Sequence, residues 1–79
     1  MTLNKLKPGH TATVIGVESK TKSERRRLLD LGILPRTIIE NVMPSPLGDP
    51  VAYRVKNTVV ALRNEQTELI EVEENEAEK

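Results

Sequence analysis

The sequence predicts a mostly β fold, a small barrel of about five strands with one helix after the first strand and a short helical turn before the last. Its 79 residues have room for one domain with one modest core. The apolar side chains are nearly all aliphatic, with nine Leu, eight Val and five Ile, and Tyr53 is the only aromatic residue. Because Val and Ile are stiff at the first side-chain torsion and fit pleated surfaces, this composition favours strands. Short apolar runs separated by turn residues point the same way.

The first strand is predicted over Thr11–Val17, after a lead-in that ends in the turn dipeptide Pro8-Gly9. The alternation of side chains places Ala12, Val14 and Gly16 on one face and Thr13, Ile15 and Val17 on the other. A glycine inside a strand is typical of a bulge or bend, which a tightly curved barrel needs. We therefore expect a bulge near Gly16.

The one long helix follows this strand. Thr21-x-x-Glu24 fits a capping box, and Ser23 is an alternative N-cap. Arg25–Leu31 is composed of helix-forming residues, and Gly32 is placed to end the helix in a left-handed conformation. The leucines expected to pack on the barrel are Leu28, Leu29 and Leu31.

The remaining strands are predicted over Thr37–Met43, Val51–Val55, Thr58–Leu62 and Leu69–Val72. Lys56-Asn57 predicts a two-residue hairpin turn, because Asn tolerates a positive φ better than other non-glycine residues. Asn64 is expected to cap a single helical turn through Glu65, Gln66 and Thr67.

Five short strands with these two helical connections indicate a small SH3-like barrel. Closing the sheet into a barrel is expected to hide the strand edges that would otherwise aggregate. We expect the barrel domain to cover residues 1–73 and an acidic, disordered tail to cover 74–79.

The formal net charge of zero conceals a split along the chain. Residues 1–64 carry eleven Lys and Arg against five acidic residues, whereas residues 65–79 carry seven Glu and only Lys79. The Glu-rich end over 73–79 lacks apolar periodicity, which predicts a solvated tail. A weak electrostatic cover of the basic body is the alternative.

The sequence does not favour an enzyme, a cofactor or a metal site. It has no cysteine, His10 is its sole histidine, and no serine has an identifiable base nearby. Asp49 is the one loop acid worth naming, and we expect it to shape its turn. No apolar run approaches the roughly 20 residues of a membrane helix, and the N-terminus lacks a signal-peptide core. These features suggest a cytoplasmic protein.

A nucleic-acid-binding or regulatory module is the main alternative, because basic residues crowd the segment 20–27. They are Lys20, Lys22, Arg25, Arg26 and Arg27. Helical steps of about 100° spread the three consecutive arginines around the helix, so they cannot all face one groove. No nearby aromatic residue could stack on bases, so a solvated helix face is favoured and no nucleic acid is expected. A single tyrosine likewise cannot line the groove of a Pro-rich-peptide-binding domain.

The loop over Pro44–Pro50 is the remaining candidate for binding. Its prolines lower the entropy of the unbound loop, so Leu47 could serve as a preordered apolar anchor for a partner. The alternative, a hairpin connection whose Leu47 folds back onto the barrel, is equally compatible with the sequence.

Three motifs, in order and at the expected spacing, resemble the FeoA family. They are Arg27-Leu28-x-Asp30-Leu31-Gly32-Ile33-x-Pro35, Pro46-Leu47-Gly48-Asp49-Pro50-Val51 and Ala61-Leu62-Arg63. The resemblance, which runs from Leu3 to about Val72, implies an SH3-like barrel and a cytosolic accessory protein of bacterial ferrous iron uptake. It also implies a partner, the membrane transporter FeoB with its cytosolic GTP-binding domain. The candidate partner contacts are Leu47, Gly48, Asp49 and Arg26.

The chain departs from the family pattern at three positions. Arg36 replaces a usual Gly, from which we expect an ordinary backbone conformation at this turn. Asn57 stands where a hairpin Gly is common, and Thr67 replaces a usual Ala and could place a hydroxyl against the barrel.

Overall fold

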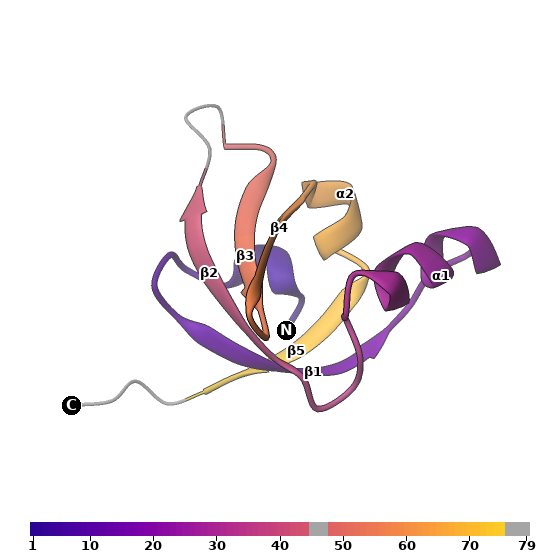
Figure 1. Cartoon of the computed structure of the whole chain (residues 1–79), viewed down its shortest axis with the longest axis horizontal. Coiled ribbons are helices and arrows are strands. Elements are labelled where there is room, and N and C mark those ends of the chain that lie inside the picture. Colours follow the sequence, from indigo (N-terminus) through magenta and orange to yellow (C-terminus); the bar gives the residue numbers. More distant parts are fainter. Residues whose placement is uncertain (45–47, 76–79) are drawn as a thin grey trace.

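The computed structural model describes residues 1–44 and 48–75 as one strongly curled antiparallel sheet with helical connections (Figure 1). Its elements are η1 (Leu3–Lys5), β1 (Thr11–Val17), α1 (Lys22–Asp30), β2 (Ile38–Pro44), β3 (Val51–Val55), β4 (Thr58–Leu62), α2 (Asn64–Thr67) and β5 (Ile70–Glu74). The strand order is β4-β3-β2-β1-β5. The predicted mostly β fold, with a helix after the first strand and a helical turn before the last, is confirmed.

The core fills the concave side of the sheet and is built from alternating positions of the strands. Its buried apolar residues are Leu3, Leu6, Ala12, Val14, Leu28, Ile33, Ile39, Val51, Tyr53, Val55, Leu62, Ile70 and Val72. The N-terminal segment and α1 each contribute leucines, so both are packed into the same core as the sheet. In β1, the predicted alternation placed Ala12 and Val14 on the buried face, as observed.

The expected bulge in β1 is present. Val14 pairs with Val72 of β5, but the next pair joins Gly16 to Glu71, so Ile15 is the extra residue. Ile15 consequently points outward, with 56% of its surface exposed. The shift also turns Val17 back toward the core.

Helix α1 begins and ends as the sequence predicts. The Thr21 hydroxyl oxygen accepts a hydrogen bond from the Glu24 N–H (3.2 Å), so Thr21 and not Ser23 is the N-cap. Gly32 has φ +93°, and the following N–H of Ile33 donates to the Leu28 carbonyl (3.0 Å), the pattern of a Schellman motif.

The expected packing of the α1 leucines holds for two of the three. Leu28 is buried and Leu31 packs against the core, but Leu29 remains 39% exposed. Leu29 differs because it lies 100° further round the helix than Leu28, on the side away from the barrel.

Two turns place a non-glycine residue at positive φ. The β3–β4 hairpin has the predicted two-residue turn, but the positive φ falls on Lys56 (+58°) and not on Asn57. Arg36 has φ +75°, so the expectation of an ordinary backbone there was wrong. The Arg36 N–H donates to the Val14 carbonyl (2.7 Å), and this bond holds the turn against β1.

The two outer strands of the sheet, β4 and β5, do not pair with each other. The expectation that barrel closure hides both edges was therefore wrong, because α2 occupies the connection between these strands. The edge of β5 is covered instead by the N-terminal segment. Thr2 bridges to Glu71, the Val72 N–H donates to the Met1 carbonyl (2.8 Å), and the terminal amine lies 2.8 Å from the Glu71 carboxylate.

Strand β5 continues to Glu74, two residues further than predicted. The next residue, Asn75, bonds through its side chain to the hydroxyls of Thr11 (3.2 Å) and Thr13 (3.1 Å). The first two residues of the predicted tail are therefore held against β1, and residues 76–79 lie outside the described part. No helix in the described ranges is long and apolar enough to cross a membrane.

Candidate partner-binding groove

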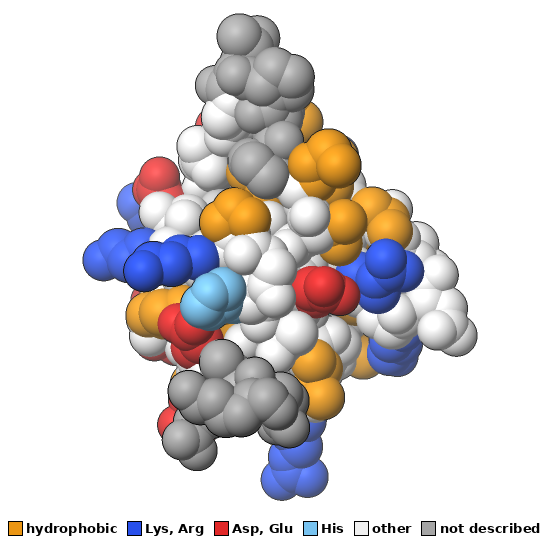
Figure 2. All heavy atoms as spheres, turned by 90° about the vertical axis from the view of Figure 1, so that its left-hand side faces the viewer, with side chains coloured by type: hydrophobic (Ala, Val, Ile, Leu, Met, Phe, Trp, Pro, Cys, Tyr) orange, Lys and Arg blue, Asp and Glu red, His pale blue; other side chains and the backbone are white. Residues whose placement is uncertain are grey.

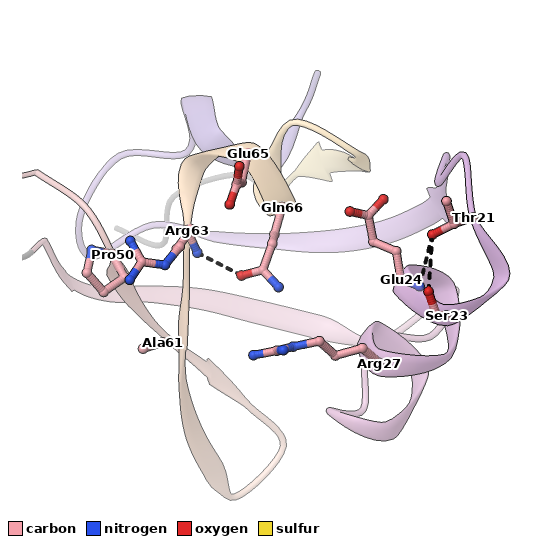
Figure 3. Close-up of a pocket in the computed structure, with 9 residues that line it drawn as sticks. All are labelled: Thr21, Ser23, Glu24, Arg27, Pro50, Ala61, Arg63, Glu65 and Gln66. Carbon is pink, nitrogen blue, oxygen red and sulfur yellow. Dashed lines mark hydrogen bonds between the residues drawn. The ribbon is translucent and has the colours of Figure 1, made fainter.

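A groove of about 690 Å³ runs between α1 on one side and β4 and α2 on the other (Figure 3). Its lining residues are Thr21, Ser23, Glu24, Arg27, Pro50, Ala61, Arg63, Glu65 and Gln66. Its size lies within the range of ligand-binding clefts, and its walls are mainly polar. Three separate parts of the chain build it, so its walls come together only in the folded protein.

The α2 wall is fixed by side chains on both sides of its single turn. The Asp49 carboxylate accepts from the Asn64 N–H (2.8 Å), and Gln66 Oε1 accepts from the Arg63 N–H (3.0 Å). Asn64 is thus the first helical residue and not the predicted cap. The buried Thr67 hydroxyl donates to the Asn64 carbonyl (3.1 Å), so it bonds within the helical turn.

The α1 wall presents Arg27 to the groove. Its side chain extends from the helix toward β4 (Figure 3). Among residues 1–44 and 48–75, no carboxylate lies within 4.0 Å of this guanidinium. The carboxylates of Glu24 on α1 and Glu65 on α2 also line the groove, but in Figure 3 both lie away from Ala61. The part of the groove next to β4 therefore carries an unpaired positive charge.

The structure separates the predicted contact residues. Leu47 lies outside the described residues. Gly48 is exposed with φ +85°, and Asp49 connects the end of the Pro-rich loop to α2, next to the groove. Arg26 does not line the groove: it is 78% exposed, and its Nε lies 3.2 Å from the Asp30 carboxylate.

Sequence reasoning missed Arg27, Ala61 and Gln66 as groove residues. A signal for the α1 wall was available, because Ser23 and Arg27 are four residues apart and must share one helix face. No comparable signal links Ala61 to α1, since the two segments are more than 30 positions apart in the chain.

Outside the groove, the described residues hold no group of three or more His, Asp or Glu side chains that could bind a metal ion. His10 Nδ1 contacts one carboxylate, that of Glu74 (2.5 Å). Figure 2 shows the histidine, in pale blue, on the surface beside acidic side chains. On that face, Lys and Arg are scattered between acidic and apolar residues and do not form a continuous basic surface.

The fold and the groove define the class of protein, a small SH3-like β-barrel domain. The chain belongs to the FeoA family, since the family model for the FeoA domain matches residues 1–74. The predicted resemblance is confirmed.

One curated relative is the Fe(2+) transport protein A/Fe(2+) transporter FeoB fusion protein of Porphyromonas gingivalis. It is 38% identical over 73 residues, which are 92% of this chain but only 8% of that protein.

Two solved structures agree with the fold. Iron(II) transport protein A of Clostridium thermocellum superposes with a TM-score of 0.87 at 35% identity, over 94% of this chain and 45% of that one. FeoA of Stenotrophomonas maltophilia, solved with zinc and described as a prokaryotic SH3 domain protein, gives 0.82 at 29% identity, over 92% and 89% of the two chains. These structures confirm the predicted SH3-like barrel.

Proposed function

We propose that this domain is a cytoplasmic accessory protein of ferrous iron uptake that associates with the cytosolic part of a FeoB-type membrane GTPase. The fusion of a similar domain to FeoB in Porphyromonas gingivalis carries the proposal. Joining two binding partners in one chain raises their effective concentration to about the millimolar range. A fusion is therefore the arrangement expected for two proteins that associate weakly when separate.

The proposed role is binding without catalysis and without a resident cofactor. Catalysis by a nucleophile needs a base within hydrogen-bond reach. In the described residues the one histidine is engaged with a glutamate on the surface and is not among the residues that line the groove. The groove instead offers hydrogen-bonding groups and charge, which suit recognition of another protein.

The proposed contact surface is the groove together with the adjoining end of the Pro-rich loop. Asp49 has two roles there: it holds α2 through the Asn64 N–H, and its second oxygen lies 3.9 Å from Arg63 in the groove wall. Leu47 and Gly48 would extend this surface along the loop, as apolar anchor and turn residue. Arg26 stays a predicted steering charge, whereas Arg27 is the arginine that we assign to the groove.

The test is a calorimetric titration of the full chain with the cognate FeoB cytosolic part. We expect a dissociation constant in the micromolar range and weaker binding by Asp49→Ala, because the groove wall loses its fixed end. Asp30→Ala is the matched control, since it removes another exposed aspartate that bonds only to Arg26. No binding at high micromolar concentration, to the cytosolic part or to full-length FeoB, would refute the proposal.

A further inference from the structure

The free edge of β4 has unpaired backbone groups at two positions. In the β3–β4 hairpin the pair next to the two-residue turn is Val55 and Thr58. Such a closing pair exchanges both backbone hydrogen bonds, and the pattern then alternates along the strands. The N–H and C=O groups of Val59 and Ala61 therefore point away from β3, toward the open edge.

Nothing in the described part of the chain covers this edge. Strand β4 is the last in the sheet order, and no loop or cap hydrogen bond reaches Val59 or Ala61. Both residues are exposed, Val59 by 51% of its surface. The strand Thr58–Leu62 also lacks the features that usually protect an edge, which are lysine, proline and bulges. It is therefore suited to pair with another strand.

The groove lies along this same edge. Ala61 is one of its lining residues, and Arg27 reaches toward β4 from the opposite wall (Figure 3). A single extended segment can lie beside β4, at the usual spacing of about 4.8 Å between strands. A second copy of the chain would have to place its own multistranded sheet beside β4, where α1 forms the opposite wall of the groove. The occupant that fits is one extended segment of a different protein.

The unpaired Arg27, on the wall that faces β4, defines the chemistry of this segment. Arg27 has no carboxylate partner among the described residues, and a guanidinium pairs most strongly with a carboxylate. We propose that β4 binds an extended segment of a partner protein as an added strand, with an acidic side chain of that segment on Arg27. The inference rests on the proposed function only for the identity of the partner.

The test follows amide hydrogen exchange of the labelled full chain during titration with the FeoB cytosolic part. Bound partner should slow exchange at Val59 and Ala61 by about tenfold or more, since their N–H groups become hydrogen-bonded. Val60 is the internal control, because its N–H already bonds to Tyr53 of β3. Binding that leaves exchange at Val59 and Ala61 unchanged would overturn the inference while the proposed function stands.

Two substitutions test the same point by affinity. Ala61→Pro removes one outward N–H without removing a bond to β3, and we expect at least about tenfold weaker binding. Arg27→Gln should weaken binding by a similar factor and reduce its salt dependence. Arg25→Gln is the matched control, since Arg25 is an exposed arginine of the same helix that does not line the groove, and it should bind as the wild type does. Equal affinities for Arg27→Gln and Arg25→Gln would contradict the assigned acidic contact.

If FeoB does not bind at all, the proposed function fails and the edge is tested with a synthetic acetylated peptide of alternating Glu and Val. Slower exchange at Val59 and Ala61 with millimolar peptide would support strand addition, and unchanged exchange would overturn it. Protection that rises with protein concentration alone would identify a second copy as the occupant, and would also overturn the inference.

Discussion

The two edges of the sheet differ in how they are covered. At β5, the first two residues of the chain pair with the strand, and the terminal amine adds an ion pair with Glu71. At β4, no other strand or loop in the described residues bonds to the outward backbone groups, and Ala61 lines the groove (Figure 3). An uncovered edge normally favours aggregation, so a protein that protects only one edge has a use for the other. The β5 edge is therefore part of the folded structure, whereas the β4 edge is available for binding.

The cover on β5 is anchored in the core. Leu3 and Leu6 are both buried, and the Asn41 side chain donates to the Leu6 carbonyl (2.8 Å). The N-terminal segment therefore cannot leave β5 without opening the core. Within residues 1–44 and 48–75, no comparable anchor extends over β4, where the outward side chains of Val59 and Ala61 are exposed.

The largest expected effect tests this difference directly. Leu3→Ala should lower the free energy of unfolding by about 2–5 kcal/mol, because a fully buried leucine is replaced by a cavity. Val59→Ala on the open edge should change it by no more than about 0.5 kcal/mol. Urea denaturation followed by circular dichroism measures both values. Similar losses for the two variants would show that the β4 edge is structural as well.

The second prediction concerns the core beneath the open edge, where Tyr53 of β3 pairs with Val60 of β4. Burial raises the pKa of Tyr53 from 10.0 to about 12. The Tyr53 hydroxyl therefore ionises more readily in the unfolded chain than in the folded protein. Burial of the neutral tyrosine contributes fully to the free energy of unfolding below pH 10, and this contribution is lost as the pH rises from 10 to about 12. A shift of this size corresponds to roughly 2–3 kcal/mol.

Denaturation curves at several pH values between about 9 and 12 measure this loss. Tyr53→Phe is the control, since it retains the pH dependence of the lysines and removes that of the tyrosine. If both proteins lose the same stability, water reaches the tyrosine, and the open edge extends into the core.

Alternation and local turn residues predicted the strands well. The bounds of β1, β3 and β4 match the prediction, because each is a short alternating run between clear turn signals. The end of β5 was missed because Glu73 and Glu74 are polar. Their place in the strand depends on pairing with β1, which lies about 60 positions earlier in the chain.

The groove was less predictable than the fold. Asp49 was identified from its loop, but its bond to the Asn64 N–H joins residues 15 positions apart. Arg27 faces the groove while its neighbour Arg26 pairs with Asp30, a distinction that needs the orientation of α1 on the barrel. Edge coverage also depends on tertiary structure, since Thr2 and Glu71 pair from opposite ends of the chain.

The smallest expected effect concerns the turn that positions the open edge. Lys56 holds a left-handed backbone conformation just before β4, which costs an L-residue about 1–2 kcal/mol. Glycine removes this strain but adds about 0.5–1 kcal/mol of conformational entropy to the unfolded chain. Lys56→Gly should therefore stabilise the protein by about 0.5–1 kcal/mol, and Asn57→Gly should destabilise it by a similar amount.

Arg36→Gly should give the same gain as Lys56→Gly, because Arg36 has the same strain in the turn between α1 and β2. The two variants should slow hydrogen exchange in different parts of the chain. Lys56→Gly should slow it in the β3–β4 hairpin, and Arg36→Gly should slow it in the turn against β1. Thermal denaturation measures the gain, and exchange measures its location. If hydrogen exchange in the hairpin slows equally in both variants, β4 opens only when the rest of the sheet opens. The β4 edge would then be as firmly held in the fold as the β5 edge, which would contradict the comparison.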